Sequence, residues 1–125
     1  MLELIVGIFD YYFLEIKVYD EDGDKKISKI MAQAVKDLSD CDIAIGTTAG
    51  IGGGGISIIN DEYEITTTTD VYADLCEKDS AKLFQRCESG IEKTLEILLL
   101  LLNNEIEEIE KLENIEINQI SSDKI

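Results

Sequence analysis

The alternation of apolar and polar residues predicts two long helices. Between Asp24 and Leu38, apolar residues recur at helical spacing on one face, and lysines occupy the other. Asp79 or Ser80 can cap a second helix that ends near Asn103. We expect its apolar stripe to face a sheet; the stripe consists of Phe84, Cys87, Ile91, Leu95, Leu98 and Leu102.

Short apolar runs between the two helices predict strands. Asp42–Ile45 and Ile56–Ile59 are short buried runs, and Tyr63–Thr69 alternates and is rich in β-branched residues. Asn60-Asp61-Glu62 is a turn signal, so the last two strands should form a hairpin. The stretch Leu2–Phe9 is apolar and fits a strand or the end of a helix. We therefore expect an α/β fold: a single small three-layer-like domain with a mixed sheet and two main helices.

The C-terminal residues have a different character. Residues 103–125 hold seven acidic residues against two lysines, and their apolar residues recur every third position, which suits neither a regular helix nor a strand. We expect an α/β ligand-binding domain over 1–102 and an acidic helical or frayed extension over 103–125. Leu99, Leu100 and Leu101 lie off the stripe of the second long helix, which predicts burial there on more than one side and a homodimer or small homo-oligomer.

A glycine-rich segment follows the first central strand. Residues 46–55 contain six glycines, beginning at Gly46 and followed by Thr47 and Thr48. Glycine lets a ligand approach main-chain N–H groups closely, and ligands of α/β sheets gather at the carboxyl ends of strands. The segment therefore predicts an anion or nucleotide site, and the alternative is a flexible hairpin connection.

Neither common phosphate-binding motif fits this segment. The dinucleotide fingerprint must open a helix, but the residues after Gly55 predict a strand. The P-loop spacing is present between Gly50 and Gly55, but Ile56 stands where the lysine is required. From the residues alone, the candidate ligand-binding set is Gly46, Thr47, Thr48, Ala49, Gly50, Gly52, Gly53 and Asp70.

Composition narrows the possible partners. The net charge of −16 argues against a nucleic acid or an anionic membrane. The chain has no histidine, and Cys41, Cys76 and Cys87 lack metal-binding spacing, so we expect no metal site and no bound cofactor. Without a signal or membrane-spanning run, we expect free, buried thiols and a cytoplasmic protein.

Several segments together resemble one methanogen family. They are Lys17-Val18-Tyr19-Asp20, Cys41 to Gly50, Thr69 to Leu75, and Gly90-Ile91-Glu92-Lys93. The chain resembles the HcgF group over roughly residues 16–100, which implies a part in making the iron-guanylylpyridinol cofactor of [Fe]-hydrogenase. More distantly, the loop is similar to nicotinamide-mononucleotide deamidases of the CinA C-terminal type, which implies an α/β fold. The resemblance thus implies a nucleotide-like small-molecule ligand, guanylylpyridinol.

The chain also departs from that family. Members begin with a strand that ends in a segment like A-T-A-E-C-F, whose cysteine forms a thioester with the pyridinol carboxylate; here the chain begins Met1-Leu2-Glu3-Leu4. None of the three cysteines matches that position, so we expect no catalytic residue and a member lacking its first strand. Two alternatives stay open: a full enzyme whose true start lies upstream, and an oligomeric interaction protein assembled through its leucine-rich helix.

Overall fold

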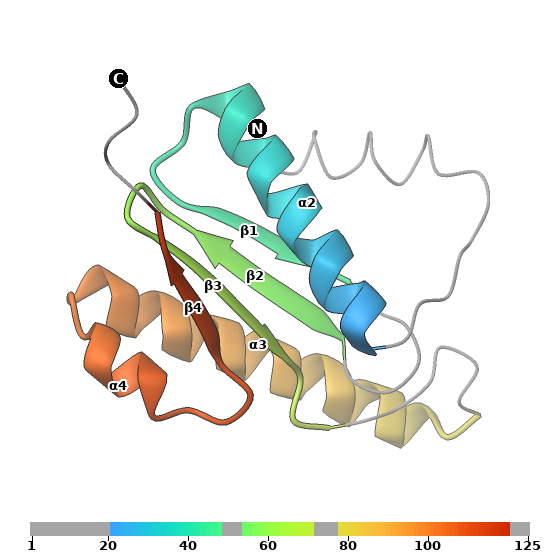
Figure 1. Ribbon diagram of the computed structural model, residues 1–125. Coiled ribbons are helices and arrows are strands. Elements are labelled where there is room, and N and C mark those ends of the chain that lie inside the picture. The colour runs from blue at the N-terminus through green and yellow to red at the C-terminus, as the bar shows by residue number, and fades with distance from the viewer. Residues whose placement is uncertain (1–20, 49–53, 72–77, 121–125) are drawn as a thin grey trace.

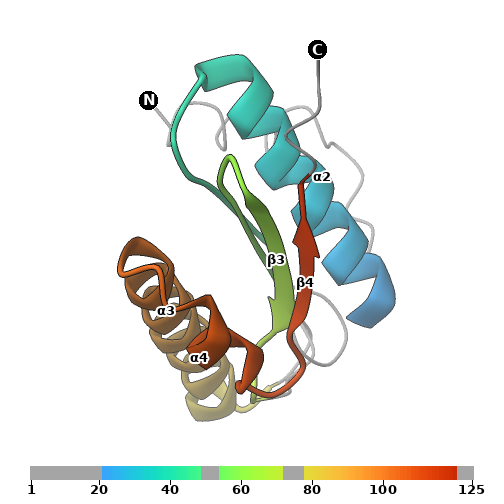
Figure 2. The same ribbon diagram turned by 60° about the vertical axis from the view of Figure 1, so that its left-hand side comes forward.

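The computed structural model describes residues 21–48, 54–71 and 78–120 as three layers, with a four-stranded sheet between helices (Figure 1). Helix α2 covers one face of the sheet, and α3 and α4 cover the other (Figure 2). The elements in chain order are α2 (Glu21–Ser39), β1 (Ala44–Thr47), β2 (Gly55–Ile59), β3 (Tyr63–Thr68), α3 (Ser80–Leu102), α4 (Ile106–Glu110) and β4 (Glu116–Gln119).

The described strands are arranged β1-β2-β3-β4, and each neighbouring pair is antiparallel. The expected α/β class and single small domain are confirmed. We expected a mixed sheet, which contains both parallel and antiparallel pairs. Among the described strands, every neighbouring pair is antiparallel. The apolar stretch Leu2–Phe9 lies outside the described residues.

Helix α2 contains the helix predicted over Asp24–Leu38, which is confirmed. Its inward residues Ala32 and Val35 are buried against the sheet. At its C-terminal end, the Lys36 ammonium donates to the Asp61 carboxylate and to the Cys41 carbonyl oxygen, each at 2.7 Å. The hydrogen bond to Asp61 raises the pKa of Lys36 above its usual range, and this contact joins α2 to the β2–β3 turn.

The predicted hairpin of β2 and β3 is also confirmed. Its turn is held by Asn60, whose Oδ1 accepts hydrogen bonds from the backbone N–H groups of Glu62 and Tyr63 at 2.9 and 2.7 Å. Because side chains alternate along a strand, Ile56 and Ile58 join the core beneath α3, whereas Ser57 lies on the other face and contacts Thr66.

Helix α3 begins at the expected residue, because the Asp79 carboxylate accepts from the Ala81 N–H at 3.0 Å. The expected orientation of its apolar stripe is wrong. Phe84, Ile91, Leu95 and Leu102 are mostly exposed, and Cys87 is exposed as well. The residues of α3 that face the sheet lie about a third of a turn around the helix from this stripe and are Arg86, Lys93, Ile97 and Leu101.

Two of those buried residues carry a charge, which explains the error. A periodicity argument assigns apolar residues to the inside, but Lys93 is buried because it binds carbonyl groups at the end of the sheet. The leucine run near the end of α3 places apolar residues on every side of the helix. It therefore does not indicate which side of α3 faces the sheet. Leu101, which we expected to point away from the sheet, lies in the core.

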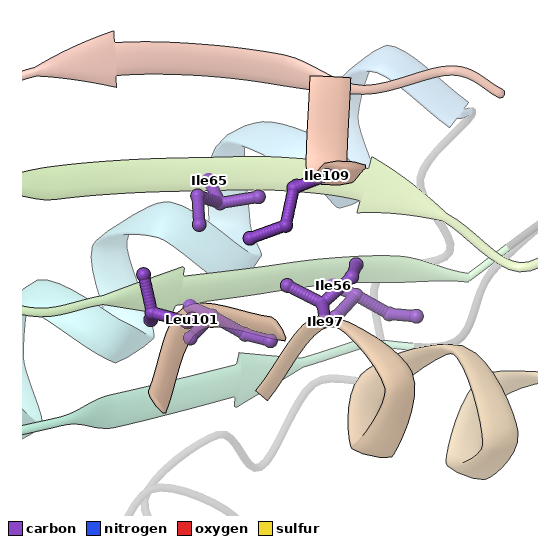
Figure 3. Close-up of a cluster of buried hydrophobic side chains, with 6 residues drawn as sticks. Ile56, Ile65, Ile97, Leu101 and Ile109 are labelled. Atoms are coloured by element: carbon purple, nitrogen blue, oxygen red, sulfur yellow. The ribbon is translucent and has the colours of Figure 1, made fainter. Parts of the chain in front are cut away.

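Residues after α3 also differ from the acidic helical or frayed extension that we expected. Helix α4 places Ile109 in the core with no exposed surface, and β4 pairs with β3 from Glu116 to Gln119. The tight core cluster beneath the sheet combines β2, β3, α3 and α4; it contains Ile56, Ile58, Ile65, Ile97, Leu101 and Ile109 (Figure 3). The acidic residues remain at the surface, so charge and burial alternate along this segment.

Candidate functional site

A cavity of about 590 Å³ lies between the sheet and the first half of α3, where β1 ends and β2 begins. This volume is within the range of small-molecule sites. The sheet side consists of Thr47, Thr48, Gly55, Ile56 and Thr69. The helix side consists of Leu83, Arg86, Cys87, Gly90, Ile91, Thr94 and Leu95. We call this cavity the α3 pocket.

The glycine-rich segment connects two adjacent antiparallel strands, so it is a hairpin connection that also borders the α3 pocket. Its ends are fixed by main-chain bonds, from Thr48 N to the Gly55 oxygen at 2.9 Å and from Thr69 N to the Gly54 oxygen at 3.0 Å. Close packing explains two of the glycines. A Cβ on Gly54 would collide with the Thr48 carbonyl oxygen, and one on Gly55 with the Asp24 carbonyl oxygen.

The predicted ligand-binding residues divide into three groups. Thr47 and Thr48 line the α3 pocket. Gly46 lies elsewhere, because its Cα faces α2, where an added Cβ would collide with the Ser28 carbonyl oxygen. The other loop residues lie outside the described part of the chain; they are Ala49, Gly50, Gly52 and Gly53.

The hydroxyl groups around the pocket are largely committed to the protein itself. Thr48 Oγ1 donates to the Asp24 oxygen at 3.1 Å and accepts from Gly55 N at 3.2 Å. Thr69 Oγ1 accepts from Gly54 N and donates to the Val71 oxygen. These threonines therefore fix the walls, and their free lone pairs can accept hydrogen bonds from a ligand.

Asp70, the remaining predicted residue, does not line the α3 pocket. Its carboxylate forms an ion pair with Lys93. Lys93 Nζ donates to the Asp70 carboxylate at 2.8 Å, to the Thr68 oxygen at 2.9 Å and to the Glu113 oxygen at 3.1 Å. Lys93 is buried, and Asp70 is about half exposed. This lysine joins the end of β3 to α3 and to the segment before β4.

The sequence reasoning missed Arg86. It is buried, lines the α3 pocket, and is the one charged residue among the described residues that line it. Its Nη2 lies against the backbone of Gly54, 3.1 Å from where a Cβ would be. A buried guanidinium binds carboxylates and phosphates strongly. The sequence held no signal for it, because a charged residue off the apolar stripe of a helix is ordinarily exposed.

The cysteines were expected to be buried hydrophobic residues. Cys41 is partly buried, but this expectation is wrong for Cys87, which is exposed at the rim of the α3 pocket. Cys76 lies outside the described residues. Within those residues, no group of three Cys, Asp or Glu side chains could hold a metal ion.

Comparison with known proteins identifies the family. A family model described as the FeGP cofactor biosynthesis protein HcgF matches residues 8–102. The chain belongs to the HcgF family. This confirms the resemblance seen in the sequence segments, and every described residue that lines the α3 pocket falls within the matched range.

Several UPF0254 proteins of methanogens are similar to this chain. A UPF0254 protein of Methanothermobacter thermautotrophicus (strain Winter) is 44% identical over 84 residues, covering 67% of this chain and 52% of the relative. UPF0254 proteins of Methanococcus aeolicus and of Methanococcus maripaludis (strain C7) are 42% and 40% identical over 96 residues, covering 77% of this chain and 57% of each relative. The chain thus spans just over half the length of these UPF0254 proteins.

Proposed function

We propose that this HcgF-family chain binds a guanylylpyridinol-like nucleotide in the α3 pocket, as part of iron-guanylylpyridinol cofactor biosynthesis. The observation that carries the proposal is a buried arginine, Arg86, in an otherwise apolar and hydroxyl-lined cavity. Such a cavity suits a ligand with a flat ring and one anionic group. Guanylylpyridinol has aromatic rings and a phosphate, and the family description names its cofactor.

The two sides of the α3 pocket support different parts of that ligand. Ile56, Leu83 and Leu95 offer apolar contact for a ring, and Arg86 offers a charge-assisted hydrogen bond to a phosphate or carboxylate. The main-chain N–H groups that the sequence predicts for an anion site belong to residues 49–53, which lie outside the described residues. The small-molecule partner and the cytoplasmic location follow from this role. No described helix has both the length and the apolar character needed to cross a membrane.

Calorimetric titration tests the binding. We expect guanylylpyridinol, and more weakly GMP, to release or absorb heat on binding to the folded protein. Arg86→Gln should weaken binding by about 10- to 100-fold, the worth of a hydrogen bond to a charged group. Lys82→Gln removes the same charge from an exposed position on α3 and should leave the affinity unchanged. No heat with folded wild-type protein at millimolar ligand would contradict the proposal.

We also propose that binding proceeds without the thioester chemistry implied by the family resemblance. Cys87 is the one cysteine among the described residues that line the α3 pocket, and it lies on α3 rather than at the end of a first strand. Mass spectrometry after incubation with the pyridinol carboxylate and an activating nucleotide should show no covalent adduct. An adduct that is present in the wild type and absent from Cys87→Ser would overturn this expectation.

The second candidate function is assembly through the leucine-rich helix. It is favoured by a specific observation, namely that the outward face of α3 carries large exposed apolar side chains. A self-associating chain would cover this face, in keeping with the expected homodimer or small oligomer. Assembly and ligand binding are compatible functions of this chain.

A further inference from the structure

The outward face of α3 is an apolar strip that runs along the whole helix. Five of its side chains are 59–68% exposed, and these are Phe84, Ile91, Leu95, Leu99 and Leu102. With partly buried Leu98 and with Glu88, the strip follows the alternating three- and four-residue spacing of a coiled-coil seam. Glu88 is the one polar residue in that series.

The strip is large enough to carry an interface. Five side chains at this exposure present roughly 600 Å² of apolar surface, and stable interfaces bury about 800 Å² on each partner. Leu98, Cys87 and the stems of the neighbouring glutamates can supply the difference. The largest apolar patch of an ordinary monomer is itself about 300–600 Å², so this strip is at the upper limit.

The α3 pocket and the apolar strip share residues. Ile91 and Leu95 line the pocket and also belong to the exposed strip, and Cys87 and Thr94 line the pocket beside it. The pocket is therefore open along the side where the strip faces outward. A helix laid on the strip would also cover this opening.

We propose that a second copy of this chain docks antiparallel along α3 and thereby closes the α3 pocket. A seam of alternating three and four spacing is self-complementary, and two-fold pairing is the commonest way for identical chains to associate. The ligand identity rests on the proposed function, but the docking itself does not. The second copy supplies a wall of the site on the side that the described residues of one copy leave open.

The position of Glu88 selects the antiparallel orientation. In a parallel pair, Glu88 of each copy would occupy the same layer of the seam and the two carboxylates would repel. In an antiparallel pair centred near Lys93, Glu88 lies opposite Leu98 of the second copy, about 15 Å from the other Glu88. That separation exceeds the screening length of about 8 Å at physiological salt. Phe84 then packs against Leu102, and Ile91 against Leu95.

Charge outside the seam predicts how salt acts on the pair. Each copy carries a net charge of −16, and Glu92 from both copies approaches the centre of the antiparallel pair. Because salt screens this repulsion, the dimer should tighten as salt rises. A basic partner protein on the same face would instead bind more weakly as salt rises.

Sedimentation equilibrium of the full chain at low and high salt tests the docking. We expect a monomer–dimer equilibrium that shifts toward dimer at high salt. Leu99→Glu should raise the dimer dissociation constant by about 100-fold, since it places a charge on the apolar strip directly beside the seam. Leu38→Glu is the matched control, because Leu38 is also a mostly exposed leucine and lies on α2, across the sheet. A wild-type monomer at high salt, or equal effects of the two variants, would overturn the proposal.

Ligand titration tests closure of the pocket separately. Leu99 does not line the α3 pocket, so Leu99→Glu should weaken GMP binding only by separating the copies. We expect about a 10-fold loss, which is regained at protein concentrations that restore the dimer. Unchanged GMP affinity in a monomeric Leu99→Glu would overturn closure. A wild type that dimerises but binds no GMP would reject the proposed ligand and support the docking.

Crosslinking tests the orientation. The antiparallel pair brings Thr94 of one copy close to Thr94 of the other, whereas a parallel pair places these residues on opposite sides of the seam. In a background with the native cysteines changed to serine, Thr94→Cys should give a crosslinked dimer with a short bismaleimide, and Lys82→Cys should not. A dimer that crosslinks through Lys82→Cys alone would overturn the antiparallel arrangement.

Discussion

At the scale of single residues, a glycine can serve either of two purposes: close packing of the backbone or close approach of a ligand. Gly46 opens the glycine-rich segment and was predicted to contact a ligand, but its missing side chain lets α2 approach the sheet. Gly54 and Gly55 are also required by close backbone contacts. A glycine count cannot separate these uses, because both depend on the absent Cβ.

Gly46→Ala should destabilise the fold. The added Cβ would collide with the Ser28 carbonyl oxygen and lie close to Ala32 N, both in the backbone of α2, so the helix must move. We expect a loss of about 1–3 kcal/mol in the free energy of unfolding, measured by denaturant titration. Gly90→Ala is the control, because its Cβ meets only a methyl group of Thr69 and gains helix propensity. Equal stability of Gly46→Ala and wild type would contradict this reading.

Lys93 is a buried lysine that joins α3 to the end of β3 and to the segment before β4. Lys93→Met removes the donor for the Thr68 and Glu113 carbonyl oxygens and for the Asp70 carboxylate. We expect a loss of about 2–4 kcal/mol, because the Thr68 and Glu113 carbonyl oxygens and the Asp70 carboxylate all lose a charged donor. Lys111→Met breaks an exposed pair with Glu108 and should cost less than about 1 kcal/mol. Similar melting temperatures for the two variants would show that Lys93 does not hold these elements together.

At the scale of elements, local signals predicted most of the described structure. Helix α2, the β2–β3 hairpin and the first residue of α3 all follow from periodicity, turn residues and a capping aspartate. The inward side of α3 could not be predicted, because the sheet-end carbonyls that Lys93 binds come from distant parts of the chain. Strand β4 was missed because its alternation is short and its pairing with β3 is tertiary. Among the described residues that line the α3 pocket, the predicted ligand-binding set contains Thr47 and Thr48 alone. Arg86 was missed because a charged residue off the apolar stripe of a helix is ordinarily exposed.

Helix α4 gives a direct test of whether residues after α3 belong to the core. Ile109 is fully buried among residues of β2, β3 and α3. Ile109→Ala should cost about 2–5 kcal/mol, the usual range for a buried aliphatic side chain. Ile106→Ala, at a partly buried position of the same helix, should cost less. A negligible effect of Ile109→Ala in thermal unfolding would restore the view of a frayed extension.

At the scale of the whole molecule, the family, the α3 pocket and the apolar strip concern the same part of the chain. The chain belongs to the HcgF family, its α3 pocket lies within the matched residues, and the open side of that pocket adjoins an exposed apolar strip. The net charge of −16 makes association with nucleic acid unfavourable, which agrees with the small-molecule ligand that we propose. Ligand binding in the α3 pocket is thus the central claim.

Amide chemical-shift mapping tests that claim most directly. Guanylylpyridinol added to isotope-labelled protein should shift the backbone amides of Thr47, Thr48, Arg86 and Gly90, which surround the α3 pocket. Amides at the middle of α2, such as Ala32 and Val35, lie across the sheet and should stay unchanged. Saturable shifts confined to the pocket are the predicted result. Saturable shifts confined to α2, or no shifts at millimolar ligand, would contradict the account.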